Sequence, residues 1–92
     1  MLELITKSKI RRKIILLFIF NQDRPYYLSE IAHLVSTSPG TAQRELNKLI
    51  KFEFLLFEKK AGLNYYSLNQ SYPLLEEVRS IVSKANGNGE IK

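Results

Sequence analysis

The sequence contains no cysteine, so a disulfide framework and a thiolate metal site are both excluded. This absence is typical of a reducing compartment, and we expect a cytoplasmic protein. We predict no cofactor. Long apolar runs are also lacking: the longest stretch, residues 14–20, is far shorter than the roughly 20 residues that a transmembrane helix needs. Basic residues 7–13 precede it, but no small-residue cleavage site follows, so we predict neither a secretory signal nor a membrane association.

Acidic residues are scarce: 9 Asp and Glu stand against 14 Lys and Arg, which gives a net charge of +5 and a pI near 9.6. Excess positive charge indicates anionic partners, with nucleic acid first and an anionic membrane surface second. The 92 residues suffice for one domain, and a domain this small gains stability from oligomerisation. An enzyme would need a His, Cys, Ser–Lys or carboxylate pair in a pocket, and no such set is visible, so we predict a protein that is not an enzyme.

The first helix is expected to run to about Phe20, with Thr6 or Ser8 as its cap. Its apolar residues lie almost all the way round, although a surface helix should show one stripe. We therefore expect the rest of the domain to cover it on more than one side, and a second subunit is a further candidate for that cover.

Turn residues 21–25 separate this helix from a second one, for which Ser29 is the predicted cap. Residues 36–40 break the second helix, and a third begins with Ser38 as N-cap and Pro39 at its first position, running to about Phe52. The residues predicted to face the core are Ile31, Ala32, Leu34 and Val35 in the second helix, and Ala42, Leu46, Leu49 and Ile50 in the third.

Residues 54–58 and 65–68 read as two strands joined by a turn at 59–62. A last helix is predicted from Pro73 to about Ala85, and residues 86–92 are predicted to form a disordered tail. The expected fold is mainly α with a small β-hairpin, in the order helix, helix, helix, strand, strand, helix. One winged helix-turn-helix domain would thus span residues 1–85.

The second helix of a helix-turn-helix pair enters the major groove of DNA. Its outward positions here carry side chains that pair with base edges and phosphates, and Ser38 and Gly40 begin the electropositive first turn. A solvated polar surface is the simpler interpretation, but Glu45 alone among residues 40–49 is acidic. The predicted contacts in this helix are Ser38, Gly40, Thr41, Gln43, Arg44, Asn47, Lys48 and Lys51.

The hairpin turn adds Lys59 and Lys60 beside Gly62, which favours a wing that contacts the DNA backbone or minor groove. The alternative is a lysine-rich turn that keeps an edge strand soluble. Five further cations open the first helix, and they either touch phosphate or form a solvated helix start. They are Lys7, Lys9, Arg11, Arg12 and Lys13.

The segment TAQRELNKL at 41–49 resembles the recognition helix of ArsR-type winged helix-turn-helix regulators, and YYSLN at 65–69 resembles their outgoing wing strand. SPGTAQREL at 38–46 and YPLLEEVR at 72–79 are similar to a subgroup of winged-helix domains associated with small nucleotidyltransferases. The resemblance covers about residues 2–85. It implies a homodimer on palindromic double-stranded DNA, with the first and last helices at the dimer interface.

The sequence departs from that pattern at several points. Many relatives have glycine where Glu53 stands, because the chain there often needs a left-handed cap. The wing is expected to be short and lacks the arginine common at its tip. Metal-sensing relatives use clusters of Cys, His and carboxylates, whereas His33 is the only histidine here, so we predict a surface or packing role for it and no metal site. No nucleotidyltransferase motif follows.

Two functions therefore remain. The first is a DNA-binding transcriptional regulator that acts as a homodimer. The second is a winged-helix protein-interaction module that docks on a nucleotidyltransferase, a toxin or a polymerase. A basic, acid-poor third helix favours the first, since a protein-docking module has no need for one.

Overall fold

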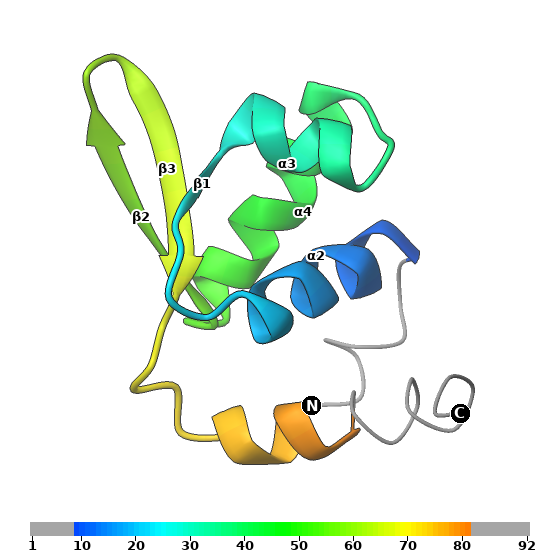
Figure 1. Ribbon diagram of the computed structural model, residues 1–92, viewed down its shortest axis with the longest axis vertical. Helices are drawn as coiled ribbons and strands as arrows, with labels where there is room; N and C mark the ends of the chain where they lie inside the picture. The colour runs from blue at the N-terminus through cyan, green and yellow to red at the C-terminus, as the bar shows by residue number, and fades with distance from the viewer. Residues whose placement is uncertain (1–8, 82–92) are drawn as a thin grey trace.

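The computed structural model describes residues 9–81 and has the architecture of a winged helix-turn-helix (Figure 1). Four helices and a three-stranded antiparallel sheet make up this part of the chain, with strand order β1-β3-β2. The elements are α2 (Lys9–Phe20), β1 (Tyr26–Tyr27), α3 (Leu28–Leu34), α4 (Pro39–Lys51), β2 (Leu55–Lys60), β3 (Leu63–Leu68) and a helical segment at 75–81.

Some predictions fall outside these residues. The first-helix caps Thr6 and Ser8, the cation Lys7, the end of the last helix at Ala85 and the tail at 86–92 all lie beyond the described range. Within residues 9–81, no helix combines the length and the apolar character needed to span a membrane.

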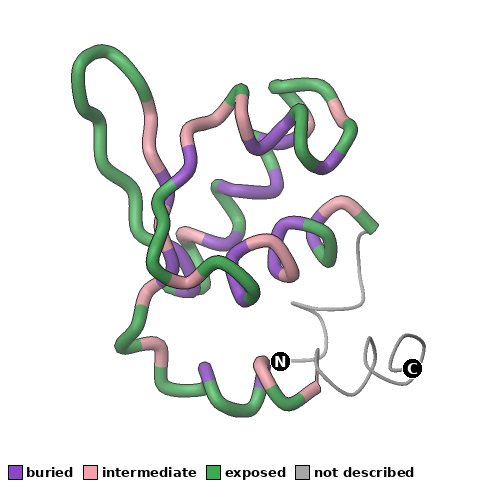
Figure 2. Tube along the Cα trace, viewed as in Figure 1, coloured by how far each residue is buried: buried purple, intermediate pink, exposed green. Residues whose placement is uncertain are grey.

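The core lies where α2, α4 and the sheet meet. The prediction for α4 is confirmed at Ala42, Leu46 and Leu49, which are fully buried, while Ile50 is half-buried. Figure 2 shows buried positions recurring along the inward sides of α2 and α4. Four buried side chains on one side of α2 complete this core: Ile14, Ile15, Phe18 and Ile19.

Strand β1 was not predicted. Tyr26 pairs with Tyr66 of β3, and its ring meets Phe18 edge-on, with 5.5 Å between centroids. Its two residues are too few for a period-2 pattern to be visible in the sequence. The strand nevertheless attaches the loop after α2 to the wing and so fixes where α3 begins.

The predicted cap of α3 is wrong. Tyr27, not Ser29, is the N-cap, and the Glu30 carboxylate accepts a bond of 3.4 Å from the Tyr27 amide. The pairing of β1 with β3 holds Tyr27 extended, and this tertiary constraint sets the helix start. The predicted inward position of Leu34 is also wrong, since Leu34 is 50% exposed while Ile31 is buried.

The start of α4 agrees with the prediction. Ser38 is the N-cap and its hydroxyl accepts a bond of 3.2 Å from the Thr41 amide, with Pro39 at the first helical position. At the other end Glu53 has a φ of 66°, in the left-handed region. The chain thus makes at Glu53 a left-handed turn of the kind that favours glycine. Asn69 supports that turn, because its side-chain amide donates to the Glu53 carbonyl at 2.8 Å.

The hairpin is longer than predicted. Lys59 and Lys60 belong to β2 and not to the turn, which consists of Ala61 and Gly62 alone. Both turn residues have positive φ, 52° and 79°, as a type I′ turn requires. This turn has the twist of the flanking strands, so the ribbon continues to its tip and projects beyond the helices (Figure 1).

The last helix begins at residue 75 and not at Pro73. Leu75 and Val78 of this helix are buried, whereas Leu74, which precedes the helix, is 40% exposed. Arg79 donates to the Gln22 side chain at 2.7 Å and so connects this helix to the loop after α2.

Candidate nucleic-acid interface

The predicted recognition surface of α4 is continuous and open to solvent. Its five longer polar side chains are all exposed, and the spacing of three and four residues places them on one face of the helix. Thr41 is half-buried beside them. The exposed side chains are Gln43, Arg44, Asn47, Lys48 and Lys51.

Glu45 does not interrupt this surface. It is only 6% exposed and points inward, where its Oε1 accepts a bond of 2.9 Å from Arg11 Nε of α2. Lys48 Nζ lies 3.8 Å from the second carboxylate oxygen. The only acidic side chain of α4 is thereby withdrawn from the outer face, whose remaining charged groups are all cations.

The same contact corrects the prediction for the basic start of α2. Arg11 is buried and bonded to Glu45, so it belongs neither to a phosphate-binding cluster nor to a solvated helix start. Lys9, Arg12 and Lys13 are exposed. The cation that packs α4 in place is therefore distinct from those that face solvent.

The first turn of α4 has one backbone amide suited to an anion. Pro39 has no N–H, the Thr41 N–H is bonded to the Ser38 hydroxyl, and the Ala42 N–H is bonded to the Ser38 carbonyl. The Gly40 N–H remains among the orphan donors that open a helix. A Cβ built on Gly40 would meet no atom within 4 Å, so a ligand can approach its backbone closely.

The two wing lysines lie on opposite faces of the sheet. Lys59 pairs with Asn64 and shares its face with buried Leu55 and Tyr66, which pack on the helices. Lys60 pairs with Leu63 and lies on the outer face. Sequence reasoning treated the two lysines as equivalent, but only Lys59 is on the side of the sheet that faces the helices.

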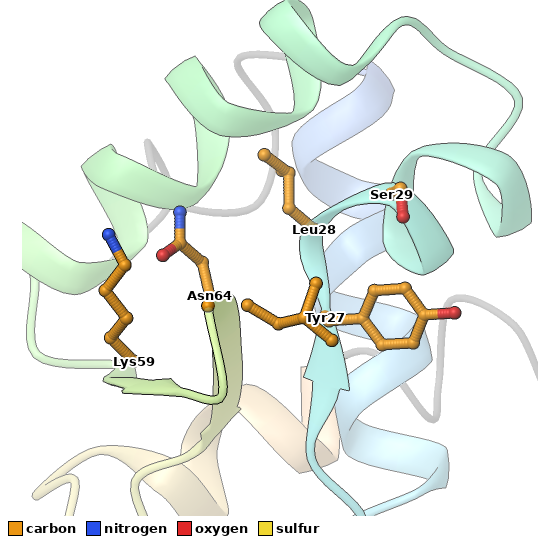
Figure 3. A pocket seen from close by; sticks show the side chains of 7 residues that line it. Tyr27, Leu28, Ser29, Lys59 and Asn64 are labelled. Carbon is orange, nitrogen blue, oxygen red and sulfur yellow. The ribbon is translucent and has the colours of Figure 1, made fainter.

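A cleft of about 270 Å³ separates the wing from the start of α3 (Figure 3). Lys59 and Asn64 lie on its wing side, and Leu28 and Ser29 line it from the helical side. Asn64 was not among the predicted contacts. The sequence could have indicated it only if β3 had been predicted to begin at Leu63, because Asn64 then lies two residues from Tyr66 on the same face of the strand.

No family model matches the chain, and no curated protein matches it either. The functional interpretation therefore depends on the fold and on the geometry of the α4 surface and the wing.

Proposed function

We propose that this protein is a sequence-specific DNA-binding transcriptional regulator. The observation that carries the proposal is the exposed face of α4, on which polar and cationic side chains follow one another while Glu45 is turned into the core. Arginine pairs with guanine, and asparagine or glutamine with adenine, in the major groove. Arg44, Gln43 and Asn47 are thus the residues that we assign to base reading.

The other exposed groups position the helix on the duplex. Lys48 and Lys51 contact phosphates on either side of the groove, and the Ser38–Gly40 turn receives a phosphate at the electropositive helix end. The wing follows α4 directly in the chain. In this proposal Lys59 lies next to the DNA backbone beside the groove that α4 enters. This arrangement of helix and wing is the usual one for winged helix-turn-helix proteins on DNA, and it is the ArsR-type role that the sequence resembles.

The active form in this proposal is a homodimer formed by the first and last helices. Phe20 at the end of α2 is 61% exposed and Leu74, just before the last helix, is 40% exposed, although both are large and apolar. Large apolar side chains left on the surface are candidates for a protein interface. A two-fold dimer would cover these residues on both subunits at once and would present two α4 helices to a palindromic site.

A specific observation also supports the alternative, a protein-interaction module. An open groove of about 370 Å³ runs between α2 and the end of α3, with Lys13 and Asn21 at its polar margin. Its apolar walls are Leu16, Leu17, Phe20, Leu34 and Val35. If a partner protein binds in this groove, substitutions on the α4 face should not change its affinity.

Selection of bound duplexes from a random DNA library distinguishes the two functions. We expect the purified protein to enrich one palindromic site, and Arg44→Ala to lose that enrichment while its fold is retained. The matched control is Leu34→Ser, which alters the α2–α3 groove and should enrich the same site. Failure of the wild-type protein to enrich any sequence, even at low salt, would contradict the DNA-binding proposal.

A further inference from the structure

The cleft between the wing and α3 carries two polar donors whose role the fold does not explain. Lys59 comes from β2 and Asn64 from β3, and they are cross-strand partners on the face of the sheet that is turned toward the helices. In Figure 3 the lysine amine and the asparagine amide extend to the same side of the wing. Two donors that extend together in this way suit a ligand with several acceptor oxygens.

Neither side chain contributes to holding the wing in place. Among residues 9–81, Lys59 forms no ion pair and Asn64 no side-chain hydrogen bond. Lys59 is exposed and Asn64 half-buried, and the amide atoms of Asn64 remain accessible to solvent. By contrast, Asn69, the next asparagine along the chain, bonds two backbone positions. Asn64 is therefore available to a partner outside the chain.

The position of the cleft identifies that partner. A helix in the major groove and a wing in the neighbouring minor groove have one sugar–phosphate backbone between them, because a single backbone separates the two grooves. The cleft lies between the wing and the start of α3, and Leu28 forms its apolar wall. In a helix-turn-helix pair this first helix crosses the DNA backbone while the second helix lies in the major groove. A lysine ammonium and a neutral amide donor are ordinary phosphate ligands.

We infer that Lys59 and Asn64 together form a clamp for one backbone phosphodiester of bound DNA. The inference rests on the proposed DNA-binding function and adds to it a residue, Asn64, and a ligand class for the cleft. It also separates the two wing lysines: Lys59 binds this phosphate, while Lys60, on the outer face, does not.

Methylphosphonate substitution of the selected duplex tests the clamp. Each phosphate in turn is replaced by a neutral methylphosphonate, and the dissociation constant is measured for the wild-type protein and for Lys59→Ala, Asn64→Ala and Lys60→Ala. For the wild type we expect one position, between the α4 and wing contacts, to weaken binding about tenfold, as befits a charge-assisted hydrogen bond. In Lys59→Ala and Asn64→Ala, the methylphosphonate at that position should change the logarithm of the dissociation constant by less than half as much as it does in the wild type.

The remaining variants and conditions separate the possible failures. Lys60→Ala should retain full sensitivity at that phosphate, and Lys59→Ala should reduce the slope of log K against log salt by about one, as one released counterion requires. Unchanged methylphosphonate sensitivity in Asn64→Ala would overturn the clamp. A changed preference for A·T over G·C pairs in that variant would also overturn it and assign Asn64 to base reading, because these pairs differ in the minor groove by the guanine 2-amino group. Absence of duplex binding by the wild type would instead contradict the proposed function itself.

Discussion

Arg11 of α2 donates its Nε proton to Glu45 of α4 across 2.9 Å, and each residue is only 6% exposed. Two buried charges are costly to desolvate, and their attraction compensates only when the geometry is good. The contact lies on the same side of α4 as buried Ala42, Leu46 and Leu49, and with them it orients α4 against α2. In this orientation Gln43, Arg44 and Asn47 face solvent while the only acid of the helix does not.

Removal of one partner of this pair should be strongly destabilising. We expect Arg11→Met to lower the free energy of unfolding by about 3–5 kcal/mol, because it leaves the Glu45 carboxylate buried with only Lys48, 3.8 Å away, for compensation. The double variant Arg11→Met/Glu45→Leu should recover most of that loss. Urea unfolding monitored by circular dichroism measures all three proteins.

The exposed pair Arg24–Glu30 provides the comparison for this prediction. Because a surface ion pair is screened by water, Arg24→Met should cost much less than Arg11→Met. Equal losses in the two single variants, or no recovery in the double variant, would show that the buried pair does not control the α2–α4 contact.

The left-handed conformation of Glu53 predicts a gain of stability on substitution. At a φ of 66°, a residue with a Cβ atom has a conformational free energy about 1 kcal/mol higher than glycine has. Glu53→Gly should therefore raise the free energy of unfolding by about 0.5–1 kcal/mol. Glu53→Ala keeps the conformational strain and should show no such gain, so an equal gain in both variants would assign the effect to the lost charge instead.

Substitution by alanine should affect stability at Gly62 but not at Gly40. Gly62 has a φ of 79°, so Gly62→Ala strains the hairpin turn by about 1 kcal/mol even though the Cβ meets no atom. Gly40→Ala places a methyl group in open space in the free protein and should leave the unfolding transition unchanged or slightly higher. It should weaken DNA binding if the proposed phosphate contact is made, because the methyl group would then lie between the phosphate and the Gly40 backbone. Full DNA affinity in Gly40→Ala would exclude that contact.

Much of the fold could be predicted from short-range patterns. Apolar spacing identified α4 and its buried residues, and Ser38 with Pro39 marked its first turn. The wrong predictions concern positions where contacts between residues distant in the sequence determine the structure. The start of α3 depends on the pairing of Tyr27 with Tyr65, and nothing near Ser29 in the sequence encodes that pairing.

The candidate site was predicted in composition but not in orientation. Glu45 lies at the same helical spacing as Ala42, Leu46 and Leu49, so its inward position was implicit in the pattern, yet its charge suggested an outward one. Its burial depends on Arg11, 34 residues away in the chain. Similarly, the two wing lysines could be placed on opposite faces only after the register of β2 and β3 was known.

Arg44 should account for a large part of sequence discrimination. If it forms a bidentate contact with guanine, Arg44→Ala should weaken binding to the selected site by about 1–3 kcal/mol and relax the preference at one base pair. Arg44→Lys keeps the charge but not the fork, so it should lose the same preference with little change in salt dependence. Equal weakening on all sequences would assign Arg44 to a phosphate instead, and fluorescence anisotropy on specific and random duplexes distinguishes the two outcomes.

The dimer proposal is best tested at exposed apolar residues and not in the core. Ile14 and Leu75 lie on the two helices concerned, but they are buried within the single chain, so a charge at either would unfold the domain and leave the interface untested. Phe20 and Leu74 are 61% and 40% exposed, and a charge there is compatible with the folded subunit.

We therefore expect Phe20→Glu and Leu74→Glu to retain helical circular dichroism while shifting the protein from dimer to monomer in sedimentation. Leu56→Glu, on the exposed outer face of the wing, is the matched control and should leave the dimer intact. In a dimer, binding of one subunit to its half-site holds the second subunit at a high effective concentration near the other half-site. The monomeric variants should therefore lose affinity for the palindrome but keep the affinity for a single half-site. A wild-type protein that sediments as a monomer at micromolar concentration, or a dimer that survives both charged substitutions, would rule out this interface.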